Sequence, residues 1–425
     1  MKHFLLLCLL TCAAGSVEAQ PSNTEIYHDG WIDLNKNGRR DIYEDRRQAV
    51  DRRVENLLRQ MTLDEKTAQM ATLYGSGRVL KDALPTPAWH NEVWKDGIGN
   101  IDEQHNGLGK FRSTYSYPYA RSVEARHAVQ RWFVEQTRLG IPVDFTNEGI
   151  RGLCHDRATS FPAQCGQGAS WNRQLIAQIA AVEAAEACAL GYTNIYSPIL
   201  DLAQDPRWGR VVECYGEDPY LVSELGREMI QGLQRGGVVS TPKHFGVYSI
   251  PVGGRDGDTR TDPKVAPREM HTLYLEPFRV AFEEAGAKGV MSSYNDYDGI
   301  PITGSRYFLT ELLRKRWGFR GYVVSDSEAV EFIKTKHRIV ERDEEMVAEA
   351  VNAGLNIRTN FTPPADFILP LRRAVQEGLI SERTIDDRVR DILRVKFELG
   401  LFDNPYVGDP EEADRLVHCE AHQAL

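Results

Sequence analysis

The feature that most constrains the fold is a regular alternation of short apolar runs and amphipathic segments between residues 71 and 400. The apolar runs predict strands at 71–75, 141–149, 193–202, 238–245, 288–295, 322–326 and 355–360. The segments between them repeat apolar residues every three or four positions, as amphipathic helices do. No Gly-x-Gly-x-x-Gly follows the first strand, so the alternation favours a closed (β/α)8 TIM-like barrel, irregular in places, over a dinucleotide-binding fold.

Polar and charged residues follow several predicted strands, where a barrel gathers its functional side chains on one rim. They include Glu148, Arg210, Lys243, His244, Tyr294 and Asp326. Carboxylates and cations together suit a polyhydroxylated ligand, because both hydrogen-bond hydroxyl groups. The sequence has no His/Cys metal cluster, phosphate-binding loop or Gly-x-Ser-x-Gly motif, so we expect no catalytic cofactor.

Composition narrows the class of partner. The hydrophobic content is 42%, the charged content is 26% and the net charge is -10. These values describe an ordinary soluble protein and argue against a nucleic-acid-binding surface. A neutral or cationic small molecule is the partner that they favour.

The N-terminus predicts export. An apolar stretch at 4–15 follows Lys2 and is too short to span a bilayer, so residues 1–19 are interpreted as a signal peptide cleaved near Ala19. A buried N-terminal helix is the alternative. Lipid anchoring at Cys12 is a weaker one, because Thr11 is larger than the residues usual before a lipidated cysteine. The predicted location is extracellular or periplasmic, without a membrane span.

The cysteines predict neither a disulfide framework nor a zinc site. Those outside the predicted signal peptide are Cys154, Cys165, Cys188, Cys214 and Cys419, which are odd in number and widely spaced. A single Cys154–Cys165 bridge is one hypothesis, and buried thiols are the favoured one.

Residues 33–44 match a twelve-residue calcium loop at every side-chain ligand position, with Gly38 where the loop turns sharply. The predicted ligands are Asp33, Asn35, Asn37, Asp41 and Glu44. A polar turn is the alternative. Flanking helices are not evident, so we expect structural calcium, not a calcium sensor.

A last long helix is predicted at 382–400, and residues 401–410, rich in Pro, Asp and Gly, resemble a linker. A further amphipathic segment follows. The predicted division is signal peptide 1–19, N-terminal extension 20–50, barrel 51–402, and a linker with the start of a second domain at 403–425.

Long motifs in the right order give a family resemblance. They are "SPILDLAQDPRWGRVVECYGEDPYLV" (197–222), "KHF" (243–245), "SSYN" (292–295) and "RKRWGFRGYVVSD" (314–326). The chain from about residue 50 to 425 resembles the barrel domain of glycoside hydrolase family 3, which holds exo-acting β-glucosidases and β-xylosidases. "NEGIRG" (147–152) is similar to a further family motif, with Arg151 in place of the usual His.

The resemblance implies roles for the rim residues. Asp326 matches the nucleophile that forms a covalent glycosyl-enzyme with retention of configuration. The residues that match the first sugar subsite are Glu148, Arg210, Lys243, His244 and Tyr294. Structural alternatives stay open: a strand-end cap for Asp326, a core pair for Lys243 and His244, and core packing for Tyr294. For Arg210 the alternative is a bridge to Glu217 or Asp218.

A retaining glycosidase also needs an acid about 5–5.5 Å from the nucleophile. In most of the family a Glu on a second, α/β sandwich domain supplies it, and we expect that domain to be absent from this sequence. Single-domain relatives use an Asp-His pair in the loop after Lys-His-Phe. The loop here, 246–265, has Asp256, Asp258 and Asp262 but no His. Glu328 suits the role loosely, about 6.6 Å along the strand from Asp326.

Three functions follow from these patterns. The favoured one is a secreted exo-acting retaining β-glycosidase that releases terminal β-D-glucose or β-D-xylose from oligosaccharides. The second is a non-catalytic sugar-binding barrel or inactive fragment, and the last is an aldolase using Lys243. Glu148 stands where glucosidases of the family more often have Asp, which favours xylose by crowding the sugar C6 group.

Overall fold

The computed structural model describes residues 23–250 and 262–425. The predicted signal peptide, as well as Asp256 and Asp258, lies outside these residues. Among the described residues, no helix combines the length and apolar character needed to cross a membrane.

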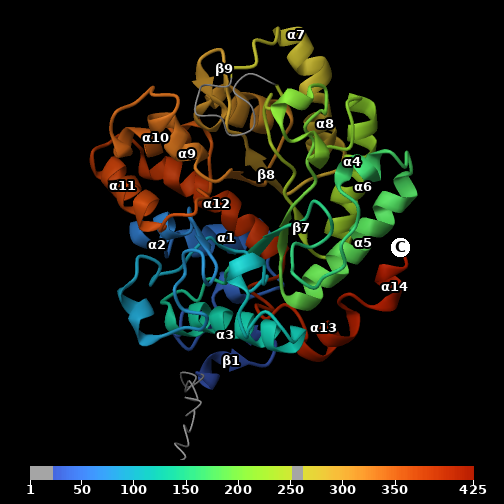
Figure 1. Ribbon diagram of the computed structural model, residues 1–425. Coiled ribbons are helices and arrows are strands. Elements are labelled where there is room, and N and C mark those ends of the chain that lie inside the picture. Colours follow the sequence, from blue (N-terminus) through green and yellow to red (C-terminus); the bar gives the residue numbers. More distant parts are fainter. Residues whose placement is uncertain (1–22, 251–261) are drawn as a thin grey trace, which may run out of the picture.

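A ring of parallel strands forms the centre of the molecule (Figure 1). Its strands are β3 (Thr72–Tyr74), β4 (Asn100–Asp102), β5 (Asp144–Glu148), β6 (Asn194–Tyr196), β7 (Val239–Ser240), β8 (Gly289–Ser292) and β11 (Tyr322–Ser325). Strands β3 to β7 pair in sequence order, and β8 pairs with β11. A parallel bridge between Phe245 and Ser292 joins these two groups.

The eighth position of the ring is held by residues 357–358. Ile357 bridges Val324 of β11, and Arg358 bridges Ala71 beside β3, both in parallel. These two bridges close the ring, so the protein has the predicted TIM-like (β/α)8 barrel, with an eighth strand reduced to two residues.

Helices surround the ring (Figure 1). The α-helices are α1 (Val50–Leu58), α2 (Leu63–Ala68), α3 (Tyr119–Gln136), α4 (Gln164–Gly168), α5 (Arg173–Leu190), α6 (Pro219–Arg235), α7 (Pro267–Glu269), α8 (Glu276–Arg279), α9 (Ala329–Thr335), α10 (Asp343–Ala353), α11 (Ala365–Gln376), α12 (Glu382–Glu398), α13 (Pro410–Leu416) and α14 (Glu420–Gln423). The π-helices are η7 (Met270–Tyr274), η8 (Val280–Glu284) and η10 (Tyr307–Arg316), and the 3-10 helices are η1 (Thr24–Ile26), η2 (Ile42–Glu44), η3 (Pro87–Asn91), η4 (Gly109–Phe111), η5 (Pro206–Trp208), η6 (Val211–Glu213) and η9 (Ile302–Gly304). Two hairpins outside the ring pair β1 (Tyr27–His28) with β2 (Trp31–Ile32), and β9 (Asp296–Tyr297) with β10 (Ile300–Pro301).

Helix starts follow the sequence signals. The capping box predicted at Thr62 is present: the Thr62 hydroxyl accepts from the Glu65 backbone N–H at 3.3 Å, and the Glu65 carboxylate accepts from that of Thr62 at 2.8 Å. Helix α5 begins after Asn172, whose side chain caps Leu175, and it ends at Gly191, whose φ of 85° few other residues adopt.

Lys396 of α12 closes the amino-terminal end of the ring. Its buried Nζ donates to Gln69 Oε1 at 2.7 Å and to the backbone oxygens of Ile98 and Pro142 at 3.2 and 2.8 Å. These acceptors stand just before β3, β4 and β5. The opposite end, where the strands finish, is left for ligands.

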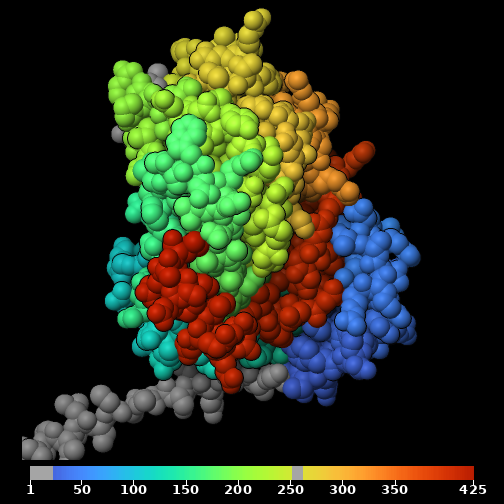
Figure 2. All heavy atoms as spheres, turned by 90° about the vertical axis from the view of Figure 1, so that its right-hand side faces the viewer, coloured from blue at the N-terminus to red at the C-terminus, as the bar shows by residue number. Residues whose placement is uncertain are grey.

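The C-terminal residues lie on the barrel. Helix α13 packs against α3 and α5, and Figure 2 shows the red C-terminal segment against the green surface of the barrel. The described cysteines are all free thiols, so the Cys154–Cys165 bridge is not formed. Of them only Cys214 is fully buried, and Cys165 is exposed, so the favoured prediction of buried thiols holds in part.

Candidate active site

The barrel brings the predicted site residues to its carboxyl-terminal rim. Glu148 is the last residue of β5, His244 follows β7 and Asp326 follows β11 directly. The other predicted residues stand in the same kind of position, with Arg210 in the loop after β6, Lys243 after β7 and Tyr294 after β8. Residues far apart in the sequence therefore converge on one site.

Asp326 is nearly buried among the other rim residues. Its side chain is only 13% exposed, its Oδ1 accepts from the Ser327 backbone N–H at 2.8 Å, and its Oδ2 lies 3.5 Å from His244 Nε2. Burial raises the pKa of Asp326, while the charges of Arg210 and Lys243 and a hydrogen bond from Tyr294 act in the opposite direction. These groups favour the ionised carboxylate that a nucleophile requires.

His244 is oriented by Asp201. The Asp201 Oδ2 atom accepts from the His244 backbone N–H at 3.1 Å and lies 2.8 Å from its Nδ1. Arg210 Nη2 lies 3.0 Å from His244 Nε2. A neutral imidazole with its proton on Nδ1 satisfies both contacts, because Nε2 then accepts from Arg210. Burial raises the pKa of Asp201 to about 7.

Lys243 and Glu148 form an ion pair at the rim. Lys243 Nζ lies 2.7 and 2.5 Å from the two carboxylate oxygens of Glu148. The Lys243 side chain is 5% exposed, whereas that of Glu148 is 31% exposed. Lys243 is thus buried and fixed by the pair, whereas Glu148 remains partly exposed.

Arg210 is held by Glu213, three residues along the chain. Its Nε and Nη2 donate to Glu213 at 2.9 and 2.8 Å, so the alternative of a bridge to Glu217 or Asp218 is wrong. The guanidinium also lies over the rings of Trp208 and Tyr248. These contacts fix its position beside His244.

Tyr294 is not plain core. Its side chain is half-buried, packs against the rings of Tyr248 and Phe332, and hydrogen-bonds Asp326. It therefore belongs to the set of groups around Asp326.

Two carboxylates at the end of β4 are also near the site. Asp102 and Glu103 were missed because their strand has three residues and follows a glycine-rich turn. Burial, Glu103 and Glu148 raise the pKa of Asp102 to about 8. Burial raises the pKa of Glu103, and Arg78, paired with it at 2.6 Å, lowers it.

Glu328 gains no support as the acid. It is exposed and precedes α9 with a φ of 69°. It lines a hollow of about 450 Å³ between α9, α10 and α11, together with Glu331 and Lys334.

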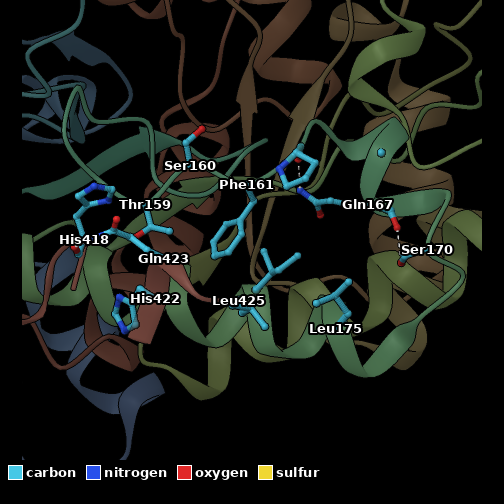
Figure 3. Close-up of a pocket in the computed structure, with 13 residues that line it drawn as sticks. Thr159, Ser160, Phe161, Gln167, Ser170, Leu175, His418, His422, Gln423 and Leu425 are labelled. Carbon is cyan, nitrogen blue, oxygen red and sulfur yellow. Dashed lines mark hydrogen bonds between the residues drawn. The ribbon is translucent and has the colours of Figure 1, made fainter. Parts of the chain in front are cut away.

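Two further hollows adjoin the barrel. One of about 370 Å³ is lined by Glu148, Arg151 and Cys154, and so extends the rim beside the Glu148 carboxylate. The other, of about 430 Å³, lies between Phe161, α5 and the C-terminal residues, including His422 and Leu425 (Figure 3). It contains none of the predicted site residues.

The predicted calcium ligands lie in one folded loop. They are Asp33, Asn35, Asn37, Asp41 and Glu44. Gly38 has a φ of 76°, as a sharp turn requires, and its N–H donates to Asp33 at 2.7 Å. The Asp41 carboxylate accepts from both asparagine amides, and Glu44 accepts from the Leu34 N–H. Among the described residues no three His, Cys, Asp or Glu side chains are grouped as metal ligands. Calcium binding stays a prediction.

The closed barrel, with a carboxylate and cations at the ends of its strands, defines a barrel enzyme of the kind that works at its carboxyl rim. Residues 62–395 match the family model described as "Glycosyl hydrolase family 3 N terminal domain". The chain belongs to glycoside hydrolase family 3.

Proteins described as β-xylosidases and β-glucosidases are similar to this chain. A putative β-xylosidase of Formosa agariphila is 31% identical over 90% of this chain and 50% of its own length. A periplasmic β-glucosidase of Salmonella typhimurium is 29% identical over 86% of this chain and 45% of its own length. The structure of a β-glucosidase from Erythrobacter marinus matches with a TM-score of 0.81 and 31% identity. The match covers 91% of this chain and 50% of that one. The chain spans about half the length of the relatives it matches.

Proposed function

We propose that the chain carries the nucleophile and the first sugar subsite of a secreted, exo-acting, retaining β-glycosidase. Its substrates are oligosaccharides with a non-reducing terminal β-D-glucose or β-D-xylose. The observation that carries the proposal is the position of Asp326, a nearly buried carboxylate at the end of β11 within reach of His244, Arg210 and Lys243.

In the first step, an oxygen of ionised Asp326 attacks the anomeric carbon. The bond from that carbon to the glycosidic oxygen breaks, and the oxygen keeps the electron pair and takes up a proton from a general acid that is not among the residues assigned to this subsite. The product is an α-linked glycosyl ester, which water then hydrolyses with overall retention. Burial raises the pKa of Asp326, and the positive charges of Lys243 and Arg210 oppose that rise and so favour the ionised carboxylate.

The subsite residues bind the sugar hydroxyls. His244, fixed by Asp201, and the Lys243–Glu148 pair offer donors and acceptors at defined positions. Fixed groups of this kind lose little freedom when the sugar binds, which is how a site gains both affinity and orientation.

Export is a second part of the proposal. It is supported by the apolar N-terminal stretch at 4–15 and by similarity to a relative described as periplasmic. The competing function, a sugar-binding barrel without catalysis, has the same rim and differs only in whether Asp326 reacts.

A 2-deoxy-2-fluoro-β-glycosyl fluoride tests the proposal. Fluoride leaves without a proton donor, so the first step needs only the nucleophile. We expect the intact mass to rise by one 2-fluoroglycosyl group, and Asp326→Asn to abolish the increase. An unlabelled wild-type protein, or a labelled Asp326→Asn variant, would refute the assignment and favour the binding function.

A further inference from the structure

An exposed aromatic side chain stands at the same rim. Phe361 follows the eighth barrel segment, and 50% of it is exposed. Single exposed apolar residues are common on proteins and need no function. Phe361 differs because it contacts two side chains, Tyr74 and Arg78, that lead in turn to Asp326 and to the nearly buried carboxylate of Glu103.

A chain of contacts connects Phe361 with Asp326. Arg358 bridges Ala71, and three residues later Phe361 meets Tyr74, with ring centroids 4.5 Å apart. The Tyr74 hydroxyl lies 3.0 Å from Ser327 Oγ. The backbone N–H of Ser327 donates to Asp326. Phe361 is therefore linked to the nucleophile through Tyr74 and Ser327.

Arg78 extends this surface. Its guanidinium lies 4.3 Å from the ring centroid of Phe111 and 5.4 Å from that of Phe361. Glu103 holds it through an ion pair of 2.6 Å, and the Glu103 side chain is 9% exposed. We call Phe361, Phe111 and Arg78 the aromatic wall. Glu103 fixes Arg78 in this surface, and the buried Tyr74 ring packs against Phe361.

The aromatic wall and the sugar-holding residues differ in chemistry. Glu148 and Lys243 offer charge to hydroxyl groups, whereas the wall offers two rings and a planar cation. A pyranose or aryl ring has apolar faces that pack on such a surface. In an exo-acting enzyme, one ring occupies the charged subsite and the departing ring lies next to it.

We propose that the aromatic wall binds the leaving group of a β-glycoside, with the departing ring packed on Phe361. This inference rests on the proposed function and adds the subsite for the second ring. Arg78, held by Glu103, donates hydrogen bonds to hydroxyl groups of a departing sugar.

Two reagents that react at the same carboxylate test the wall. A 2,4-dinitrophenyl 2-deoxy-2-fluoro-β-glycoside carries a ring as its leaving group, whereas the matching glycosyl fluoride carries none. Labelling is followed by intact mass against reagent concentration, which gives the rate constant and the half-saturating concentration. Phe361→Ala should raise the half-saturating concentration of the aryl reagent by about 2- to 12-fold, the usual range for losing one aromatic contact. The glycosyl fluoride should be unaffected.

Control variants make the test specific. Tyr220→Ala removes an aromatic side chain that is 71% exposed on α6 and should change neither reagent. Phe361→Trp keeps a ring and should retain the wild-type value for the aryl reagent. Phe361→Leu keeps apolar bulk without a ring, so it should behave like Phe361→Ala, and melting temperatures verify that each variant is folded.

The outcomes separate the two proposals. If neither reagent labels the wild type, the proposed function fails. If the wild type is labelled but Phe361→Ala changes both reagents equally, or neither, the proposed function stands and the aromatic wall is refuted.

Discussion

Replacing Glu148 with Asp tests how the protein distinguishes glucose from xylose. Both Glu148 oxygens accept from Lys243 Nζ, at 2.7 and 2.5 Å, and 31% of the side chain is exposed toward the open side. Asp is one methylene shorter, so the carboxylate withdraws by about 1.5 Å, one C–C bond length. The space that it leaves is where we propose that the C6 group of a glucose unit lies.

The size of the effect follows from one methylene. Sites discriminate against one such group by about 1–3 kcal/mol, or about 10- to 200-fold in rate. The substitution also lengthens the contact with Lys243, whose side chain is only 5% exposed. That loss applies to both sugars and cancels in their ratio.

The assay compares labelling by 2-deoxy-2-fluoro-β-glucosyl fluoride and the corresponding xylosyl fluoride. We expect Glu148→Asp to shift the ratio of labelling rates toward glucose by at least about 10-fold. Glu148→Gln keeps the length of the side chain and should leave the ratio near its wild-type value. An unchanged ratio in Glu148→Asp, or an equal shift in Glu148→Gln, would refute the reasoning.

Three further results are expected. Labelling by the glycosyl fluoride should fall as the pH drops through the raised pKa of Asp326. Lys243→Met removes a positive charge that lowers this pKa, so the acid limb of the labelling profile should move to higher pH in the variant. A shift to lower pH would contradict the account. Burial lowers the pKa of Lys396 from 10.5 to about 7, so between these values the unfolded chain binds more protons. The free energy of unfolding should therefore rise with pH by up to about 1.4 kcal/mol per unit relative to Lys396→Met, and parallel profiles in a denaturant titration would contradict this. Calcium at about 100 times its dissociation constant should stabilise the fold by about 2.7 kcal/mol. EDTA should lower the melting temperature, and Asp33→Ala should abolish the stabilisation by calcium. A wild-type melting temperature that responds to neither calcium nor EDTA would refute the predicted calcium site.

Much of the barrel was predictable because buried parallel strands appear as apolar runs. Strand β11 and its neighbour β8 lie within the predicted ranges. The range 193–202 was too long, since only Asn194–Tyr196 pairs as a strand and the apolar residues after it pack in a loop. Strand β4 was missed, because three residues after two glycines give no periodic signal.

The rim residues were predictable for a topological reason, whereas their partners were not. Carboxyl ends of parallel strands meet, so Glu148, Lys243 and Asp326 had to be near one another. No sequence rule gives side-chain direction within a long loop. The contacts of Asp201 with His244 and of Glu213 with Arg210 therefore emerged only from the structure.

The most direct test of the central claim is to locate the adduct within the chain. After reaction with the 2-fluoroglycosyl fluoride, proteolysis and fragment masses identify the residue that carries the sugar. The account predicts an ester on Asp326 alone. An adduct on Glu328, two residues away, or on Glu148, would contradict it.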